Sequence, residues 1–92
     1  MCWYENDGSQ NFTTHIITTS ADNPYSVYAV DVDADGDMDV LTAASQAGIS
    51  WYENDGSESF TAHAITTVWN FACSVYAVDV DGDGDMDVLS AF

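Results

Sequence analysis

The sequence predicts an all-β protein built from four-stranded antiparallel units, and three observations support that class. The chain repeats itself, because residues 3–44 align with residues 51–92 without a gap and agree at most positions. Short runs of β-branched and aromatic residues alternate with turns rich in Gly, Asn and Asp. No segment shows the 3.6-residue apolar period and the end caps of a helix. A strand-rich repeat of this length indicates an array of small sheets.

Four strand-like segments fill each repeat of 48 residues. Residues 74–80 are rich in β-forming side chains and lead into an acidic loop, and residues 87–92 leave that loop. Earlier in the chain, residues 49–53 run into an Asn-Asp-Gly turn that favours a hairpin, and residues 60–67 close the unit. Four short antiparallel strands in one repeat match a β-propeller blade in size.

The phase of the repeat predicts two half blades around one full blade. We expect residues 2–19 to supply the third and fourth strands of a blade, residues 26–67 to form a full blade, and residues 74–92 to supply first and second strands. A half blade leaves an apolar strand edge unpaired, and such an edge is a template for association. The predicted partner is therefore a second copy of the chain, whose residues 2–19 continue the blade begun by residues 74–92. A closed ring of whole copies needs six blades from a trimer or eight from a tetramer.

A nine-residue acidic loop occurs once in each repeat, at residues 31–39 and 79–87. Aspartate stands at loop positions 1, 3, 5, 7 and 9, and glycine at position 6 permits a sharp turn. Carboxylates from positions 1, 3, 5 and 9, with the backbone carbonyl of position 7, form an all-oxygen set that suits calcium. The predicted metal ligands are Asp31, Asp33, Asp35, Asp37, Asp39, Asp79, Asp81, Asp83, Asp85 and Asp87. The expected cofactor is Ca²⁺, one ion per repeat and two per chain.

The loop differs from an EF-hand. Position 12 is Thr42 in the first copy and Ser90 in the second, where an EF-hand requires a bidentate Glu. A strand, and not a helix, is predicted to follow each loop. The carboxylate at position 9 is therefore expected to close the site.

Charge restricts the partners that the chain can bind. The sequence has 16 acidic residues and neither Lys nor Arg, which gives a net charge of −16. Five acidic residues lie in each loop, and 47% of all residues are hydrophobic, as in a folded protein. Nucleic acids and anionic membranes are bound mainly through Lys and Arg, so both are excluded as partners. Without metal, the carboxylates of each loop repel one another.

The motifs resemble a known family of repeats. The segments 27–41 and 75–89 share the pattern Val-Tyr-Ala-Val-Asp-Val-Asp-x-Asp-Gly-Asp-Met-Asp-Val-Leu, and Trp-Tyr-Glu-Asn-Asp-Gly-Ser occurs twice. On these segments the chain resembles the FG-GAP/VCBS class of integrin-type β-propeller repeats, over nearly its whole length. The resemblance implies that each metal loop joins the innermost strand of a blade to the second and that its calcium is structural. Integrin-type propellers carry a full ring in one chain, whereas this sequence holds two blades' worth.

Residues that suggest catalysis or zinc have a structural interpretation. His15 and His63 stand at the same place in the two repeats, as do Glu5 and Glu53. A residue repeated at blade spacing is expected on a strand surface, and neither histidine has a cysteine or second histidine nearby in the sequence. No Gly-x-Ser-x-Gly motif or nucleophile–base pattern is present. We therefore expect that the chain is not an enzyme.

The two repeats differ most at residues 20–25 and 68–73. This segment is expected to link consecutive blades, and variable loops on a rigid scaffold often bind ligands. Trp69 and Phe71 are the candidates for stacking on a sugar or contacting a protein; the alternative is that they fill the space between blades. Cys2 and Cys73 are not repeat features, which leaves open an interchain disulfide or two small apolar residues.

These observations predict a calcium-stabilised propeller module that binds a partner or serves as a scaffold. One alternative is a lectin-like, carbohydrate-binding propeller, and another is a duplicated or engineered repeat fragment without a specific ligand. Extracellular modules bind calcium with dissociation constants of about 10⁻⁴–10⁻³ M. The expected location is therefore extracellular or the cell surface, although no signal peptide is visible.

Overall fold

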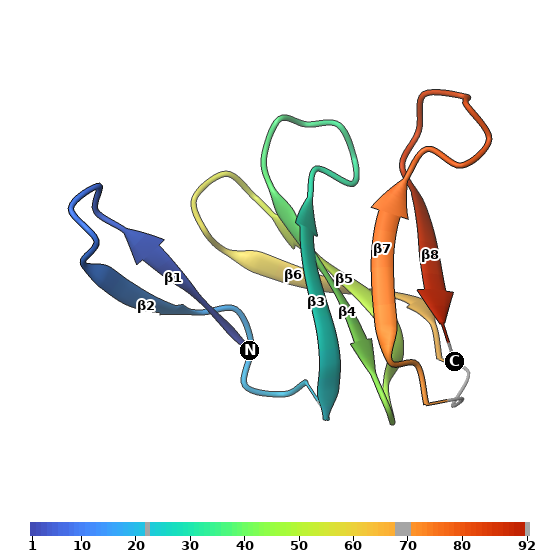
Figure 1. The fold of residues 1–92 in the computed structure, drawn as a ribbon, viewed down its shortest axis with the longest axis horizontal. Coiled ribbons are helices and arrows are strands. Elements are labelled where there is room, and N and C mark those ends of the chain that lie inside the picture. The colour runs from blue at the N-terminus through green and yellow to red at the C-terminus, as the bar shows by residue number, and fades with distance from the viewer. Residues whose placement is uncertain (22, 68–70, 92) are drawn as a thin grey trace.

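The computed structural model describes residues 1–21, 23–67 and 71–91, which form three antiparallel sheets (Figure 1). The first sheet pairs β1 with β2, the second has the order β3-β4-β5-β6, and the third pairs β7 with β8. The strands are β1 (Cys2–Asn6), β2 (Phe12–Ile16), β3 (Pro24–Val30), β4 (Asp39–Ala44), β5 (Gly48–Asn54), β6 (Phe60–Thr66), β7 (Ser74–Val78) and β8 (Asp87–Ala91). The described residues contain no helix, so none that could cross a membrane. The prediction of an all-β, antiparallel chain is confirmed.

One strand prediction was too long. The strand expected to reach Val80 ends at Val78, because the next residue already belongs to the acidic loop. The carboxylate of Asp79 accepts hydrogen bonds from the backbone N–H groups of residues 82, 83 and 84, which fold the chain back at this point. The β-forming preference of Val80 was outweighed by this local hydrogen bonding of Asp79.

The core lies between the four-stranded sheet and β7. Leu41 and Ala43 of β4 and Ile49 of β5 pack with Val75 and Ala77 of β7. The ring of Tyr28 on β3 lies 4.7 Å from that of Tyr76 on β7, centroid to centroid. Every residue of β4 is buried, whereas burial along the other strands is partial. This central strand is hydrogen-bonded on one edge to β3 and on the other to β5.

The hairpins that join β1 to β2 and β5 to β6 have the same construction. In the second hairpin, the N–H of Asp55 donates to the carbonyl of Ser59 at 3.1 Å, and the side chain of Asn54 accepts the N–H of Gly56 at 3.0 Å. In the first, Asp7 N–H donates to the carbonyl of Asn11 at 3.0 Å. Asn and Asp side chains that bond the backbone two residues ahead stabilise such turns. The hairpin predicted from the Asn-Asp-Gly sequence is therefore present.

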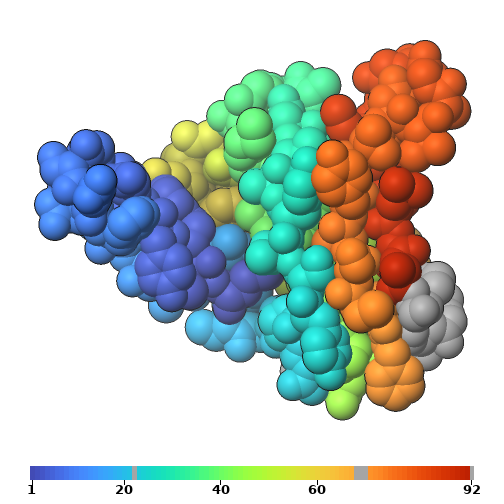
Figure 2. Space-filling view, in the orientation of Figure 1, coloured from blue at the N-terminus to red at the C-terminus, as the bar shows by residue number. Residues whose placement is uncertain are grey.

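The three sheets stand side by side, with the β1–β2 hairpin and the β7–β8 hairpin on opposite sides of the central sheet (Figures 1 and 2). The loops between β3 and β4 and between β7 and β8 project from the same edge of the row, at the top of Figure 1. The described chain forms an open row of sheets and not a closed ring. The assignment of these sheets to propeller blades, and their completion by other copies, stay predictions.

Candidate metal centres

The first candidate metal centre is the loop between β3 and β4. Four carboxylates there each place one oxygen within 4.8 Å of the others, from Asp31, Asp33, Asp35 and Asp39. These are loop positions 1, 3, 5 and 9, the positions that the sequence predicts as side-chain ligands. Asp37, at position 7, was expected to contribute only its carbonyl, and its side chain is not in the cluster.

Backbone N–H groups hold the carboxylates of the first loop. The two oxygens of Asp31 accept the N–H groups of Asp35 at 3.2 Å and Gly36 at 2.9 Å. Gly36 has φ +93°, a conformation that side chains rarely adopt, so glycine at position 6 permits the turn that brings its N–H to Asp31. Asp35 in turn accepts the N–H of Asp37 at 2.8 Å. Hydrogen bonds from the loop's own backbone therefore hold its acidic side chains in place.

The aspartate at position 9 joins the loop to the sheet. Asp39 is fully buried, and its Oδ2 accepts the N–H of Val32 at 2.9 Å. Its Oδ1 accepts the N–H of Asn54, at the end of β5, at 2.8 Å. The side-chain amide of Asn54 also donates to the carbonyl of Met38 at 3.1 Å. Asn54 was not predicted to be part of the site, although its recurrence in Trp-Tyr-Glu-Asn-Asp-Gly-Ser was a signal.

The electrostatics of this loop favour a cation. Desolvation raises the pKa of Asp33 to about 6, and the nearby charges of Asp35 and Asp39 also raise it. A carboxyl group with a raised pKa is one whose negative charge is poorly compensated. A divalent ion bound among these oxygens would supply that compensation.

The second candidate centre, between β7 and β8, is similar but less complete. Its cluster contains Asp79, Asp81 and Asp87, and Asp83 is not within it. Hydrogen bonds from the backbone N–H of Gly84, followed by those from Gly82 and Asp83, lower the pKa of Asp79. Asp87 accepts the N–H of Val80 at 2.9 Å but is only half-buried. Asp85, predicted to act through its carbonyl, is exposed.

The comparison with known families gives a match over nearly the whole chain. The FG-GAP-like repeat pattern matches residues 1–42 and again residues 35–90. The chain belongs to the FG-GAP-like repeat family. The searches of curated proteins and of solved structures gave no match. The resemblance inferred from the acidic loops is thus confirmed at the level of the family.

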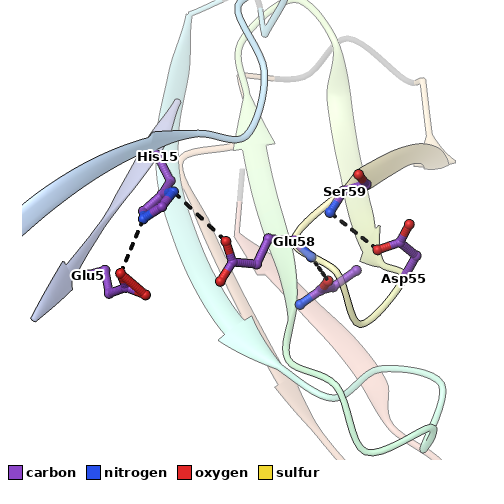
Figure 3. Close-up of polar contacts among 6 residues, drawn as sticks. Glu5, His15, Asp55, Glu58 and Ser59 are labelled. Carbon is purple, nitrogen blue, oxygen red and sulfur yellow. Dashed lines mark hydrogen bonds and ion pairs between the residues drawn. The ribbon is translucent and has the colours of Figure 1, made fainter. Parts of the chain in front are cut away.

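Each of the two repeats in this chain also carries a Trp, a His and a Glu that contact one another on paired strands. His15 stacks on Trp3 with ring centroids 4.3 Å apart, and its Nε2 lies 3.5 Å from a carboxylate oxygen of Glu5. Its Nδ1 lies 3.9 Å from Glu58, which belongs to the β5–β6 hairpin of the neighbouring sheet (Figure 3). The contact with Glu58 connects the first sheet to the second.

The second repeat has the same group, and among the described residues its histidine makes no contact with a neighbouring sheet of the kind that His15 makes with Glu58. His63 stacks on Trp51 at 4.7 Å, and its Nε2 lies 2.8 Å from Glu53. The recurrence of this group on strand surfaces agrees with the structural interpretation of both histidines.

The other predicted site residues are not brought together in the described chain. Trp69 lies outside the described residues. Phe71 has 78% of its surface exposed, and both interpretations of it, contact with a ligand and filling of the space between blades, stay predictions. Cys2 and Cys73 are both free and exposed.

The two loops differ in sequence at position 4, which gives a matched pair of variants. Ala34 has φ +62° and its counterpart Gly82 has φ +76°. Because a Cβ atom is unfavourable in this conformation, Ala34→Gly should raise the free energy of unfolding by up to about 1 kcal/mol, and Gly82→Ala should lower it by about 1 kcal/mol. Urea unfolding of the metal-free protein checks both signs. If the two variants change the free energy of unfolding in the same direction, the backbone of Ala34 is not strained.

Proposed function

We propose that the chain is a calcium-stabilised FG-GAP-like module that serves as a binding or scaffold domain, assembles with copies of itself, and is not an enzyme. The observation that carries the metal proposal is the first loop, where four carboxylates converge within 4.8 Å. Asp39 connects this cluster to the core through its bonds to Val32 and Asn54.

The donor set favours calcium over other ions. The first cluster offers four carboxylates and no nitrogen or sulfur. Zinc prefers thiolate and imidazole, and magnesium prefers fewer carboxylates with several retained waters. Calcium accepts six to eight oxygens in flexible geometry, which suits a loop held mainly by its own backbone. Bound calcium would offset the repulsion among the loop carboxylates.

The proposed role of the ion is structural. The first loop contacts three consecutive strands, because it joins β3 to β4 and its Asp39 bonds to the end of β5. An ion that binds the folded loop and not the unfolded chain stabilises the fold by mass action. The proposed location is extracellular or the cell surface, where calcium is abundant enough to fill sites with dissociation constants of about 10⁻⁴–10⁻³ M.

Calorimetric titration of the full chain with Ca²⁺ and with Mg²⁺, each paired with thermal unfolding, tests this proposal. We expect Ca²⁺ to bind and to raise the melting temperature, Mg²⁺ to act more weakly, and a chelator to reverse the effect. Asp33→Ala and Asp81→Ala should each remove one binding event, since each residue belongs to one cluster. A chain whose melting temperature is the same with millimolar Ca²⁺ and with chelator would refute the proposal.

A lectin-like function is the second candidate. It is supported by Phe71, whose ring is exposed on the segment that differs between repeats. Glycan-array binding that is lost in Phe71→Ala and Trp69→Ala, but kept in Tyr25→Ala, would support sugar recognition. Absence of glycan binding would leave a protein-binding or scaffold role.

A further inference from the structure

The repeat allows each residue at the two ends of the chain to be compared with an equivalent residue 48 positions away in the central sheet. Strand β8 is equivalent to β4, and β1 is equivalent to β5. Leu41 on β4 is fully buried, whereas Leu89 on β8 is 48% exposed. Tyr52 on β5 is 8% exposed, whereas Tyr4 on β1 is 61% exposed. The same side chains are thus covered in the centre and uncovered at the ends.

The uncovered side chains flank free strand edges. In the central sheet β4 pairs with β5. In the part of the chain that the structure describes, β8 pairs with β7 alone and β1 with β2 alone. Each of these two strands therefore presents unpaired backbone groups on one edge.

The backbone of β1 presents donors at the positions that the central pair uses. The N–H of Asp7 donates to Asn11 across the β1–β2 hairpin, and N–H directions alternate along a strand. The N–H groups of Cys2, Tyr4 and Asn6 therefore face the free edge. In the central sheet the equivalent N–H of Asn54 reaches Asp39.

The second metal loop lacks the contacts that this edge would provide. Asp87 retains the bond from Val80, the counterpart of the Val32 bond, but no described residue stands in for Asn54. The central hairpin also closes over the first loop, since a Cβ on Gly56 would lie 3.0 Å from Asp37. Its counterpart Gly8 has nothing within 4 Å.

We propose that β1 of a second copy of the chain adds to the free edge of β8, and that Asn6 of that copy completes the second metal loop. The register is that of the β4–β5 pair, with β8 in place of β4 and β1 of the second copy in place of β5. Val88 then lies opposite Tyr4, Leu89 opposite Trp3 and Ser90 opposite Cys2. The N–H of Asn6 donates to Asp87, as that of Asn54 does to Asp39. This inference rests on the proposed self-assembly and calcium binding and adds the register and the shared site.

A second copy fits this edge because β1 carries the Trp-Tyr-Glu-Asn sequence of β5, and β8 carries the Asp-Val-Leu sequence of β4. Charge opposes the association, since each copy has a net charge of −16. Calcium in the second loop reduces that repulsion at the contact itself. Association and metal binding at the second loop therefore promote each other, whereas the first loop is complete within one chain.

Disulfide trapping tests the register. In a Cys73→Ser background, Ser90→Cys places a thiol opposite the native Cys2 of the second copy. Cα separations of about 4.5–5.5 Å across an antiparallel pair lie within disulfide range. With calcium and a mild oxidant, this variant should form covalently linked chains. The control Ala91→Cys, whose side chain points to the opposite face, should not. Equal linking of the two variants, or none in either, would overturn the register.

Calcium titration at two protein concentrations tests the shared site. Asp33→Ala leaves the second loop as the intact site, and Asp81→Ala leaves the first. The apparent affinity of the second loop should rise with protein concentration, by about tenfold between dilute monomer and assembled protein, while that of the first loop stays constant. Tyr4→Pro, which removes an edge N–H, should abolish the rise. A second loop with concentration-independent affinity would refute the sharing.

The two proposals fail in distinguishable ways. A chain that binds calcium at both loops but remains a monomer by mass measurement, without disulfide trapping, contradicts the strand addition and leaves the calcium site intact. A chain that binds no calcium contradicts the proposed function itself.

Discussion

Replacing Asp39 by alanine is expected to abolish metal binding at the first loop and to lower the free energy of unfolding of the metal-free protein by about 3 kcal/mol. The buried carboxylate accepts N–H groups from the half-buried Val32 and Asn54, and a donor that loses its partner costs about 1–3 kcal/mol when water does not replace it. Chemical unfolding in chelator measures the structural effect, and calorimetric titration measures the loss of the site.

Asp33→Ala is the matched control for this result. Asp33 belongs to the same cluster, but it is exposed and its charge is poorly compensated without metal. This variant should also lose the first site, yet its metal-free stability should be unchanged or slightly higher. If both variants lose the same stability in chelator, the bonds of Asp39 to the strands are not what stabilises the loop.

Replacing Gly48 by alanine is expected to destabilise the protein by about 3 kcal/mol or more. Gly48 begins β5 with φ +77°, and a Cβ atom there would overlap the backbone carbonyl of Thr66. Because the obstacle is backbone and not a movable side chain, either β5 or the end of β6 must shift. Thermal and urea unfolding should show the loss with and without calcium.

Gly8→Ala separates strain from overlap. Gly8 has a similar φ of +88°, but no atom lies within 4 Å of an added Cβ. It should therefore cost only the conformational strain, about 1 kcal/mol. Equal losses at Gly8 and Gly48 would show that the carbonyl of Thr66 yields at little cost.

The strands could be predicted from sequence because local signals agreed. In β5 and β6, β-forming residues flank an Asn-Asp-Gly turn whose side chains bond their own backbone. The repeat also supplied each pattern twice, which made coincidence improbable. The end of β7 was misplaced because Asp79 draws the following amides into a loop, an effect that propensity alone does not report.

The candidate sites were predicted only in part, because some of their residues are far apart in the sequence. The aspartates of each loop lie within nine residues, so their spacing defines a cluster. Asn54 reaches Asp39 across 15 positions, and this contact depends on the register between β4 and β5. The His15–Glu58 contact depends on how two sheets pack, which no local pattern specifies.

Strand β4 is buried at every residue and is paired on both edges, so its stability against local unfolding differs from that of the rest of the chain. Local opening requires least free energy at the β1–β2 hairpin, which has no buried residue, and most at β4; β7 lies between the two because Val75 and Ala77 belong to the core. Amide protons of β4 should therefore be the last to exchange with deuterium. A substitution that weakens the β1–β2 hairpin should therefore lower the free energy of unfolding less than one that disturbs β4.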